Sequence, residues 1–270
     1  MDTAEQMQPA PLSLESAMDA AWPALDRRET GGWVLRAAAG VTQRANSIWP
    51  GGMNGCSDDT LAALLREART WYRSRRLPVI FQMTDGAAAA ALHALLDAEG
   101  FTRQSLTLVM TCNVTEVPDT FTLPGTPAVE LSSAPSDDWM QVWWQVDGRG
   151  GDKERGIALE SSPAAPPCTR WRGRNEDGRP AAVGRLALPD GERGGIYCMA
   201  TIPEARRRGF GSAVLRSMLQ AGNDSGVTDF WILVTAANHR AQELYARAGF
   251  RENGRYVYRQ EKPRRSLPGC

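Results

Sequence analysis

The chain has 270 residues and a mass of 29.5 kDa, a length typical of about two small domains. Hydrophobic residues make up 42% of it, enough to form a core, and this excludes a disordered chain. The 31 basic and 31 acidic residues balance to a net charge of zero, and no apolar run approaches the ~20 residues that cross a bilayer, so we expect neither nucleic acid nor a membrane as a partner.

The first 115 residues alternate helical and strand patterns. Leu14, Met18, Trp22 and Leu25 recur at helical spacing, and we expect the glycine pair at 31–32 to end that helix. Further helices are predicted at residues 59–74, with an N-cap at 57–59, and at 87–99; strands are predicted at 33–36, 46–49, 79–83 and 107–110. This alternation predicts an α/β or α+β fold class.

Residues 116–127 contain three prolines and no periodicity, so we interpret them as a linker. Beyond them, strands are predicted at 129–131, 169–174, 180–188, 195–201, 230–234 and 256–258, and helices at 137–145, from Gly209, and at 238–248. The predicted organisation is therefore a first domain at 1–115, the linker, a second domain at 128–262 and a tail at 263–270.

One internal similarity relates the two halves. Residues 95–101 share a pattern with residues 244–250, 149 positions later, including a Gly-Phe pair at the end of each. At this offset strand 79–83 falls close to strand 230–234, and helix 59–74 overlays the helix from Gly209. We interpret the similarity as a diverged tandem duplication, with chance recurrence of a helix–Gly–Phe–strand junction as the alternative.

The segment 195–211 carries the clearest chemical signal. An apolar strand ends near Pro203, arginines follow at 206–208, and Gly209 and Gly211 open an amphipathic helix. Backbone N–H groups at a helix start are unsatisfied and lie at the positive end of the helix dipole. Glycines leave these donors accessible, so the combination predicts a site for a pyrophosphate.

Two better-known phosphate motifs do not fit this segment. A Walker loop needs Lys followed by Ser or Thr after its second glycine, whereas Gly211 is followed by Ser212. The dinucleotide fingerprint starts with a glycine where this chain has Arg206. A solvated turn before a helix would also show arginines and glycines, so the segment alone leaves both interpretations open.

A second motif lies downstream of strand 230–234. Asn238 opens a helix that carries Leu244 and Tyr245 and ends at Gly249-Phe250. Together with Arg206, Gly209 and Gly211, this motif resembles the GNAT superfamily of acyl-CoA-dependent N-acyltransferases. The resemblance covers about residues 128–262 and extends only faintly to the first half. It implies two tandem GNAT-like domains, each a mixed, mainly antiparallel sheet flanked by helices.

The resemblance also implies a co-substrate, acetyl-CoA, and its binding residues. Met199, Ala200 and Thr201 would hold the pantetheine arm on a strand, with a strand N–H near Met199 polarising the acetyl carbonyl. The pyrophosphate would be held by Arg206, Arg207, Arg208, Gly209, Phe210, Gly211 and Ser212. No metal is implied.

Two further residues have roles in this interpretation. Asn238 would contact the pantetheine, cap its helix, or do both. Tyr245 would contact the co-substrate and act as the catalytic acid that protonates the departing thiolate, with a packed core tyrosine as the alternative. At the offset of 149, Tyr245 corresponds to Leu96 and Asn238 to Ala89, so we expect the first half to be a degenerate copy without co-substrate.

The sequence therefore predicts an N-acetyltransferase that moves an acetyl group from acetyl-CoA to a primary amine of a small molecule, by direct transfer in a ternary complex. A peptide or protein amine acceptor and a non-catalytic CoA-binding sensor or scaffold are the alternatives. The general base is open among Asp147, Asp152, Glu154 and a water relay. One of the tryptophans at 139, 143 and 144 could line the acceptor site.

The cellular setting is inferred from the cysteines and the N-terminus. The five cysteines are widely spaced, which is typical of reduced thiols rather than of disulfides or a zinc site. The N-terminal residues show no charged-then-apolar signal pattern. We expect a cytoplasmic monomer or homodimer.

Overall fold

The computed structural model describes residues 13–51, 55–84, 89–121, 127–148, 151, 153–156, 168–175 and 177–262, with the side chains of 168–171 outside this description. Asp152, the centre of the predicted linker and the predicted tail at 263–270 also lie outside the described residues.

The described residues of the first half form three α-helices and two groups of strands. The helices are α1 (Leu14–Ala21), α2 (Asp58–Ser74) and α3 (Ala90–Ala98). A three-stranded antiparallel sheet is formed by β1 (Asp26–Thr30), β2 (Trp33–Ala37) and β3 (Trp49–Pro50), and β4 (Ile80–Thr84) and β5 (Thr102–Asn113) follow. Helix α2 confirms its prediction: Ser57 Oγ accepts a hydrogen bond from the Thr60 N–H at 3.2 Å.

The first helix is shorter than its spacing predicts. It ends at Ala21, and an exposed strand, β1, which the sequence did not reveal, precedes the glycine pair at 31–32. Pro23 follows the C-cap Trp22 and has no N–H to continue the helix. Leu25 therefore lies outside the helix and is 62% exposed, although its spacing suggested a place on the buried face.

The second half contains the remaining elements in the predicted order. Its longer described helices are α4 (Asp137–Asp147), α6 (Phe210–Asp224) and α7 (His239–Arg247), and residues 153–156 are also helical. Its strands are β6 (Val129–Ser132), β7 (Cys168–Arg174), β8 (Pro180–Ala187), β9 (Arg193–Thr201), β10 (Asp229–Thr235) and β11 (Arg251–Gln260). One short 3-10 turn, Val114–Glu116, leads into the predicted linker, and a second, Asp119–Phe121, lies in its described part.

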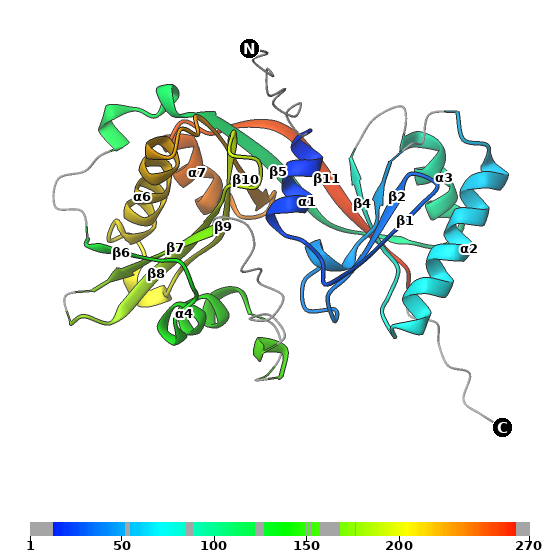
Figure 1. The fold of residues 1–270 in the computed structure, drawn as a ribbon, viewed down its shortest axis with the longest axis horizontal. Coiled ribbons are helices and arrows are strands. Elements are labelled where there is room, and N and C mark those ends of the chain that lie inside the picture. Colours follow the sequence, from blue (N-terminus) through cyan, green and yellow to red (C-terminus); the bar gives the residue numbers. More distant parts are fainter. Residues whose placement is uncertain are drawn as a thin grey trace, which may run out of the picture.

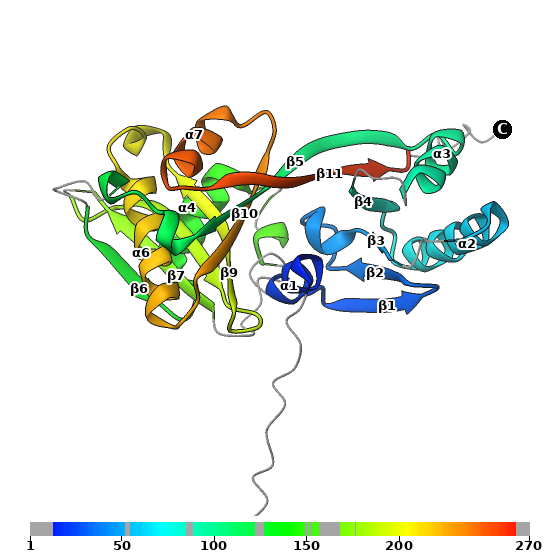
Figure 2. The same ribbon diagram turned by 90° about the horizontal axis from the view of Figure 1, so that it is seen from above.

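Strands from both halves form one eight-stranded sheet in the order β4-β11-β5-β10-β9-β8-β7-β6. The halves exchange strands. The whole of β10 pairs with residues 107–113 of β5, and β11 pairs with both β4 and β5. Figures 1 and 2 show β5 and β11 running from one lobe of the molecule to the other. The domain boundaries at residues 115 and 128 therefore stay a prediction. Strands from before residue 115 and after residue 128 are hydrogen-bonded to each other within the one sheet.

The internal repeat is visible in the order and spacing of the elements. Strand β4, helix α3 and strand β5 begin at positions 80, 90 and 102, and β10, α7 and β11 each begin 149 positions later. Both helices end at a left-handed glycine, with φ of +76° at Gly100 and +94° at Gly249. The predicted tandem arrangement of mixed, mainly antiparallel sheets with helices is confirmed.

The sheet of the second half is covered on both faces. Ile196, Phe230 and Ile232 pack in one core with α6 and α7, whereas Tyr197 and Trp231 pack in another core with α1 and α4. This alternation follows from the two-residue period of a strand. A separate core in the first half lies under α2 and α3.

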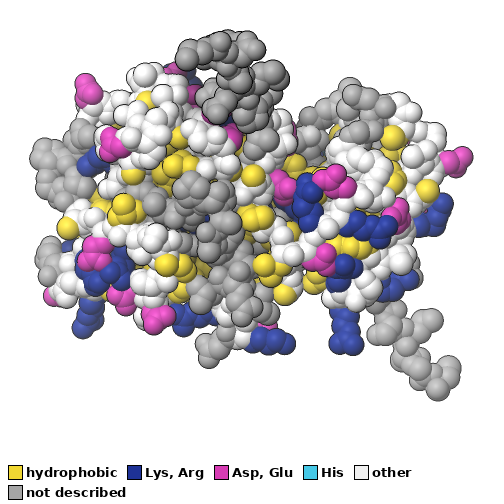
Figure 3. All heavy atoms as spheres, in the orientation of Figure 1, with side chains coloured by type: hydrophobic (Ala, Val, Ile, Leu, Met, Phe, Trp, Pro, Cys, Tyr) yellow, Lys and Arg dark blue, Asp and Glu magenta, His cyan; other side chains and the backbone are white. Residues whose placement is uncertain are grey.

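On the face shown in Figure 3, acidic and basic side chains lie beside each other over both halves. In the part of the chain that the structure describes, no helix is long and apolar enough to cross a membrane.

Candidate functional site

The parallel strands β9 and β10 separate partway along their length. Their pairing runs from Arg193 opposite Asp229 to Ile196 opposite Ile232 and ends there. Strand β9 continues to Thr201 and β10 to Thr235 without further pairing between them. The splay leaves an edge of β9 backbone at residues 197–201 that can accept an extended ligand as an additional strand.

A bulge lies in β9 where the splay begins. The register with β8 shifts between Val183 and Arg185, and Cys198 has a left-handed φ of +53°. A β-bulge re-aims the side chains that follow it. Met199 Sδ lies toward the α6 face, 3.0 Å from where a Cβ on Gly184 would stand. The predicted pantetheine-binding residues 199–201 thus lie directly after the bulge, on the free edge of the strand.

The N-terminus of α6 follows this free edge. Gly209 is its N-cap, with φ of +83°, and no side chain caps the helix. A Cβ on Gly209 would meet nothing within 4 Å, and one on Gly211 would lie 3.4 Å from Thr201 Oγ1. Because no side chain caps it, the helix presents free N–H donors beside the end of β9, and no acidic residue in the first turn opposes an anion there. The predicted cradle therefore has the open space that an anion needs.

The three arginines before α6 are exposed. The Arg206 Nε donates a hydrogen bond to the carbonyl oxygen of Thr201 at 3.2 Å, Arg207 has a left-handed φ of +63°, and the Arg208 guanidinium lies 5.6 Å from the Phe210 ring centroid. Phe210 itself is buried, and Ser212 is half-buried in the first turn. The arginines add positive charge to the same end of the helix.

Asn238 caps α7, which is one of the two roles predicted for it; the other is contact with the pantetheine. Its Oδ1 accepts a hydrogen bond from the Ala241 N–H at 3.2 Å, and the residue is exposed just after the end of β10. It therefore stands on the β10 side of the splay, while the glycine-opened end of α6 stands on the β9 side.

Tyr245 lies in the core under α6 and α7, with its ring 6.3 Å from the ring of Phe250. Burial raises the pKa of its hydroxyl well above the usual value, and the negative charge of Asp147 raises it further. The phenol therefore keeps its proton throughout the neutral range. Asp147, at the end of α4, lies near enough for its charge to act on a residue of α7.

The other candidates for the acceptor side lie around α4. Glu154 is half-buried and accepts a hydrogen bond from the Gly151 N–H at 2.9 Å, which lowers the pKa of its carboxyl. Trp139 and Trp143 are buried, and Trp144 is half-buried. Trp139 Nε1 donates a hydrogen bond to the carbonyl oxygen of Gly184 at 3.1 Å, so this tryptophan fastens α4 to the sheet.

One feature of the structure, the arginines beside Tyr197, had no signal in the sequence. The guanidinium carbons of Arg44 and Arg185 lie 5.0 and 5.5 Å from the ring centroid of Tyr197, the residue directly after the last β9–β10 pair. Arg44 comes from the first half, and only tertiary structure brings it to the splay. In the described part of the chain, no group of three His, Cys, Asp or Glu side chains is placed to hold a metal.

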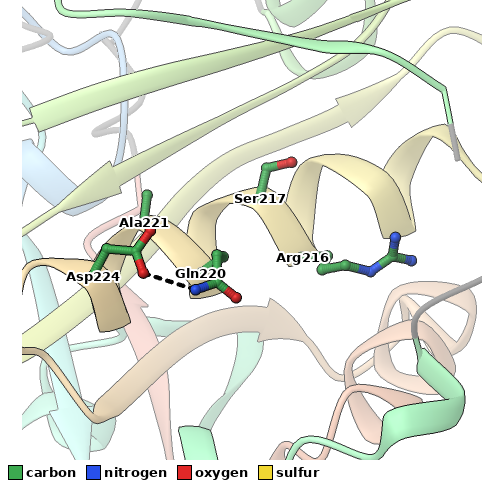
Figure 4. Close-up of a pocket in the computed structure, with 5 residues that line it drawn as sticks. All are labelled: Arg216, Ser217, Gln220, Ala221 and Asp224. Atoms are coloured by element: carbon green, nitrogen blue, oxygen red, sulfur yellow. Dashed lines mark hydrogen bonds between the residues drawn. The ribbon is translucent and has the colours of Figure 1, made fainter.

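A surface hollow lies elsewhere, on the outer face of α6 (Figure 4). It is lined by Arg216, Ser217, Gln220, Ala221 and Asp224, which lie on one face of the helix over consecutive turns. Gln220 Nε2 donates a hydrogen bond to Asp224 Oδ1 at 2.8 Å within it. The hollow brings together no residues from other elements, so we assign it no part in the site.

The splayed strands and the glycine-opened helix are the framework of a GNAT-superfamily N-acetyltransferase, and comparison with known proteins agrees. The chain belongs to the family described as probable histone acetyltransferase Rv0428c C-terminal, which matches residues 12–259. It is 26% identical over 246 residues to the uncharacterized N-acetyltransferase YobR of Bacillus subtilis strain 168, covering 91% of this chain and 96% of the relative.

Solved structures show the same fold. The GCN5-related N-acetyltransferase from Kribbella flavida matches with a TM-score of 0.64 at 16% identity, over 95% of this chain and 94% of that one. A tandem GNAT protein from the clavulanic acid biosynthesis pathway matches with a TM-score of 0.58 at 14% identity, over 75% of this chain and 70% of that one.

Proposed function

We propose that this protein transfers an acetyl group from acetyl-CoA to a primary amine of a small molecule, directly and in a ternary complex. The observation that carries the proposal is the position of the splay. The free edge of β9 leads into the uncapped, glycine-opened N-terminus of α6, so one extended ligand with an anionic middle can contact both.

The residues divide the ligand between them. The backbone of Met199, Ala200 and Thr201 would hold the pantetheine arm, and the segment from Arg206 to Ser212 would hold the pyrophosphate through backbone N–H groups and arginine charge. Asn238 would border the pantetheine from the β10 side. Acetyl-CoA supplies the acyl thioester.

The reaction needs two proton movements. The amine nitrogen forms a bond to the acyl carbon and the carbon–sulfur bond breaks, so the nitrogen must lose a proton and the sulfur must gain one. Tyr245 is a phenol, which holds its proton at neutral pH even without the upward shift of its pKa that burial and Asp147 cause. We assign it as the acid for the sulfur, and Asp147, directly or through water, as the base for the nitrogen.

The proposal is tested by measuring free-thiol release from acetyl-CoA against a panel of primary amines, with the product identified by mass. A small amine acetylated with turnover supports it. Acetylation confined to peptide or protein amines would show that the acceptor belongs to the alternative class. Tight CoA binding without transfer to any amine would identify a non-catalytic CoA-binding protein.

A further inference from the structure

Five side chains from both halves form a cluster on the α1 and α4 side of the sheet, which we call the Trp–Arg cluster: Trp22, Arg44, Trp143, Arg185 and Tyr197. The guanidinium carbons of both arginines lie over the rings of Trp22 and Tyr197. The distances to the Trp22 and Tyr197 ring centroids are 5.4 and 5.0 Å from Arg44, and 5.1 and 5.5 Å from Arg185. The Trp22 ring centroid is 5.6 Å from that of Tyr197 and 6.5 Å from that of Trp143.

The cluster contains buried hydrogen-bond donors without acceptors. Trp22 and Trp143 are 2% and 4% exposed, and the Nε1 of each, like the Nε of Arg44, is closed to solvent and has no hydrogen-bond partner among the described residues. Unpartnered buried donors are rare and call for an explanation. The fold can satisfy an indole on this face, because Trp231 Nε1 donates to the Tyr197 hydroxyl at 3.0 Å. All three unmet groups are donors, so the missing partner is an acceptor.

The charge of the cluster is also uncompensated at Arg44. Two buried arginines of the first and second halves have carboxylate partners: Arg36 pairs with Asp19 at 3.0 Å, and Arg259 pairs with Asp97. Among the described residues, Arg44 makes no such ion pair. Burial lowers its pKa, but the surrounding phenols and the Cys198 thiol raise it above the usual value, so the guanidinium stays positive. A cation without a carboxylate, beside unmet donors, fits an anionic ligand.

The cluster borders the splay from the side opposite the predicted co-substrate. Tyr197 is the first β9 residue beyond the pairing with β10, and it points toward α1 and α4, whereas Met199 points toward α6. Figures 1 and 2 show α1 between the two lobes, and Trp22 is its C-cap. A second substrate on this side would approach the same gap from the opposite face of the sheet.

We propose that the Trp–Arg cluster binds a carboxylate of the amine acceptor, with Arg44 as the residue that determines specificity. The inference rests on the proposed acetyl transfer and narrows its acceptors to small primary amines that carry a carboxylate, such as amino acids. A planar guanidinium matches a carboxylate through paired hydrogen bonds, and the indole donors can complete the set of partners. The first half of the chain then contributes to substrate choice through Arg44.

The test compares amino acids with their own carboxamides as acetyl acceptors, and with O-phosphoethanolamine as a phosphate-bearing amine. Wild-type protein should prefer the acids by at least about tenfold in kcat/KM. Arg44→Met should abolish that preference by raising the KM of the acids, with kcat for the carboxamides nearly unchanged. Arg75→Met is the matched control, because Arg75 stacks on Trp71 at 3.7 Å in the first half, away from the splay, and it should keep the preference.

Calorimetry measures the affinity of the preferred acid in the absence of acetyl-CoA. This measurement tests the cluster independently of the proposed acetyl transfer. Binding of the acid that Arg44→Met weakens at least about tenfold supports the cluster even where no acetyl transfer occurs. Equal use of acids and carboxamides, a preference for the phosphate, or an unchanged preference in Arg44→Met would overturn it while acetyl transfer stands. Arg44→Lys, which keeps the charge but not the planar fork, is used where melting shows that Arg44→Met does not fold; retained full preference in Arg44→Lys would also overturn the assignment.

Discussion

Helices α2 and α6 occupy equivalent places in the two halves, and their N-termini differ in what they can bind. Ser57 caps α2 with its own hydroxyl, and Asp58 and Asp59 place negative charge in the first turn. Helix α6 has a left-handed glycine at the same place, no side-chain cap and no acidic residue in its first turn. One helix end is satisfied and would repel an anion, whereas the other has free donors.

Helices α3 and α7 show the same contrast. Ala89 stands at the N-cap of α3 and makes no side-chain hydrogen bond, whereas Asn238 caps α7. Leu96 is buried where α7 carries Tyr245. Both helices nevertheless end in the same turn: the N–H groups of the following phenylalanines donate to the carbonyl oxygens of Leu96 and Tyr245 at 2.9 and 3.0 Å. The backbone scaffold is therefore repeated in both halves. At these two equivalent positions, only the second half carries a polar side chain that could take part in catalysis.

The largest expected effect is at Tyr245. Tyr245→Phe removes one hydroxyl and keeps the ring against Phe250, so acetyl-CoA affinity and the melting temperature should change little. Loss of the acid should lower kcat about 10²- to 10⁴-fold. Steady-state kinetics and calorimetry on this variant measure both quantities.

Tyr72→Phe in the first half is the control for this prediction. The Tyr72 hydroxyl donates to the Arg36 carbonyl oxygen at 2.8 Å and accepts from the Arg36 N–H at 3.2 Å. Its loss should reduce stability by about 1–3 kcal/mol without changing kcat. Turnover of Tyr245→Phe within a few fold of wild type would make Tyr245 a structural residue like Tyr72.

The second effect is on CoA affinity. Gly209→Glu would place an anion where the uncapped end of α6 is open, and we expect the Kd for CoA to rise more than tenfold, a loss of over ~1.4 kcal/mol. Because Gly209 has φ of +83°, the variant also carries backbone strain, on the order of 1–2 kcal/mol.

Gly226→Glu controls for that strain. Gly226 follows the other end of α6 with φ of +87°, and a Cβ added there would meet nothing within 4 Å, so the cost in stability should be similar. Calorimetric titration should show wild-type CoA affinity for this variant. Equal affinity in the two variants would show that the end of α6 does not bind the pyrophosphate.

The smallest effect is expected at the equivalent helix end of the first half. Ser57→Ala removes the cap of α2 and should lower the free energy of unfolding by about 1 kcal/mol. It should leave CoA affinity unchanged, with one CoA bound per chain in both proteins. A second CoA per chain, or weaker CoA binding in the variant, would mean that the first half also holds co-substrate.

Local sequence determined most of the elements, though not β1 or the end of α1, and the arrangement around α6. The caps at Ser57 and Asn238 and the glycines at 100 and 209 act through hydrogen bonds and backbone conformations within a few residues, which a sequence pattern can reveal. The internal repeat was also recognisable in the sequence. Strand β4, helix α3 and strand β5 each begin 149 residues before β10, α7 and β11.

Tertiary structure alone decided how the halves combine. The exchange of β5 and β11 depends on pairing between strands far apart in the chain, and no local pattern specifies which edge a strand will join. The position of Arg44 beside Tyr197 depends on the same long-range packing. The sequence alone therefore pointed to the co-substrate side of the splay, whereas the opposite side, formed by both halves, became visible only in the folded chain.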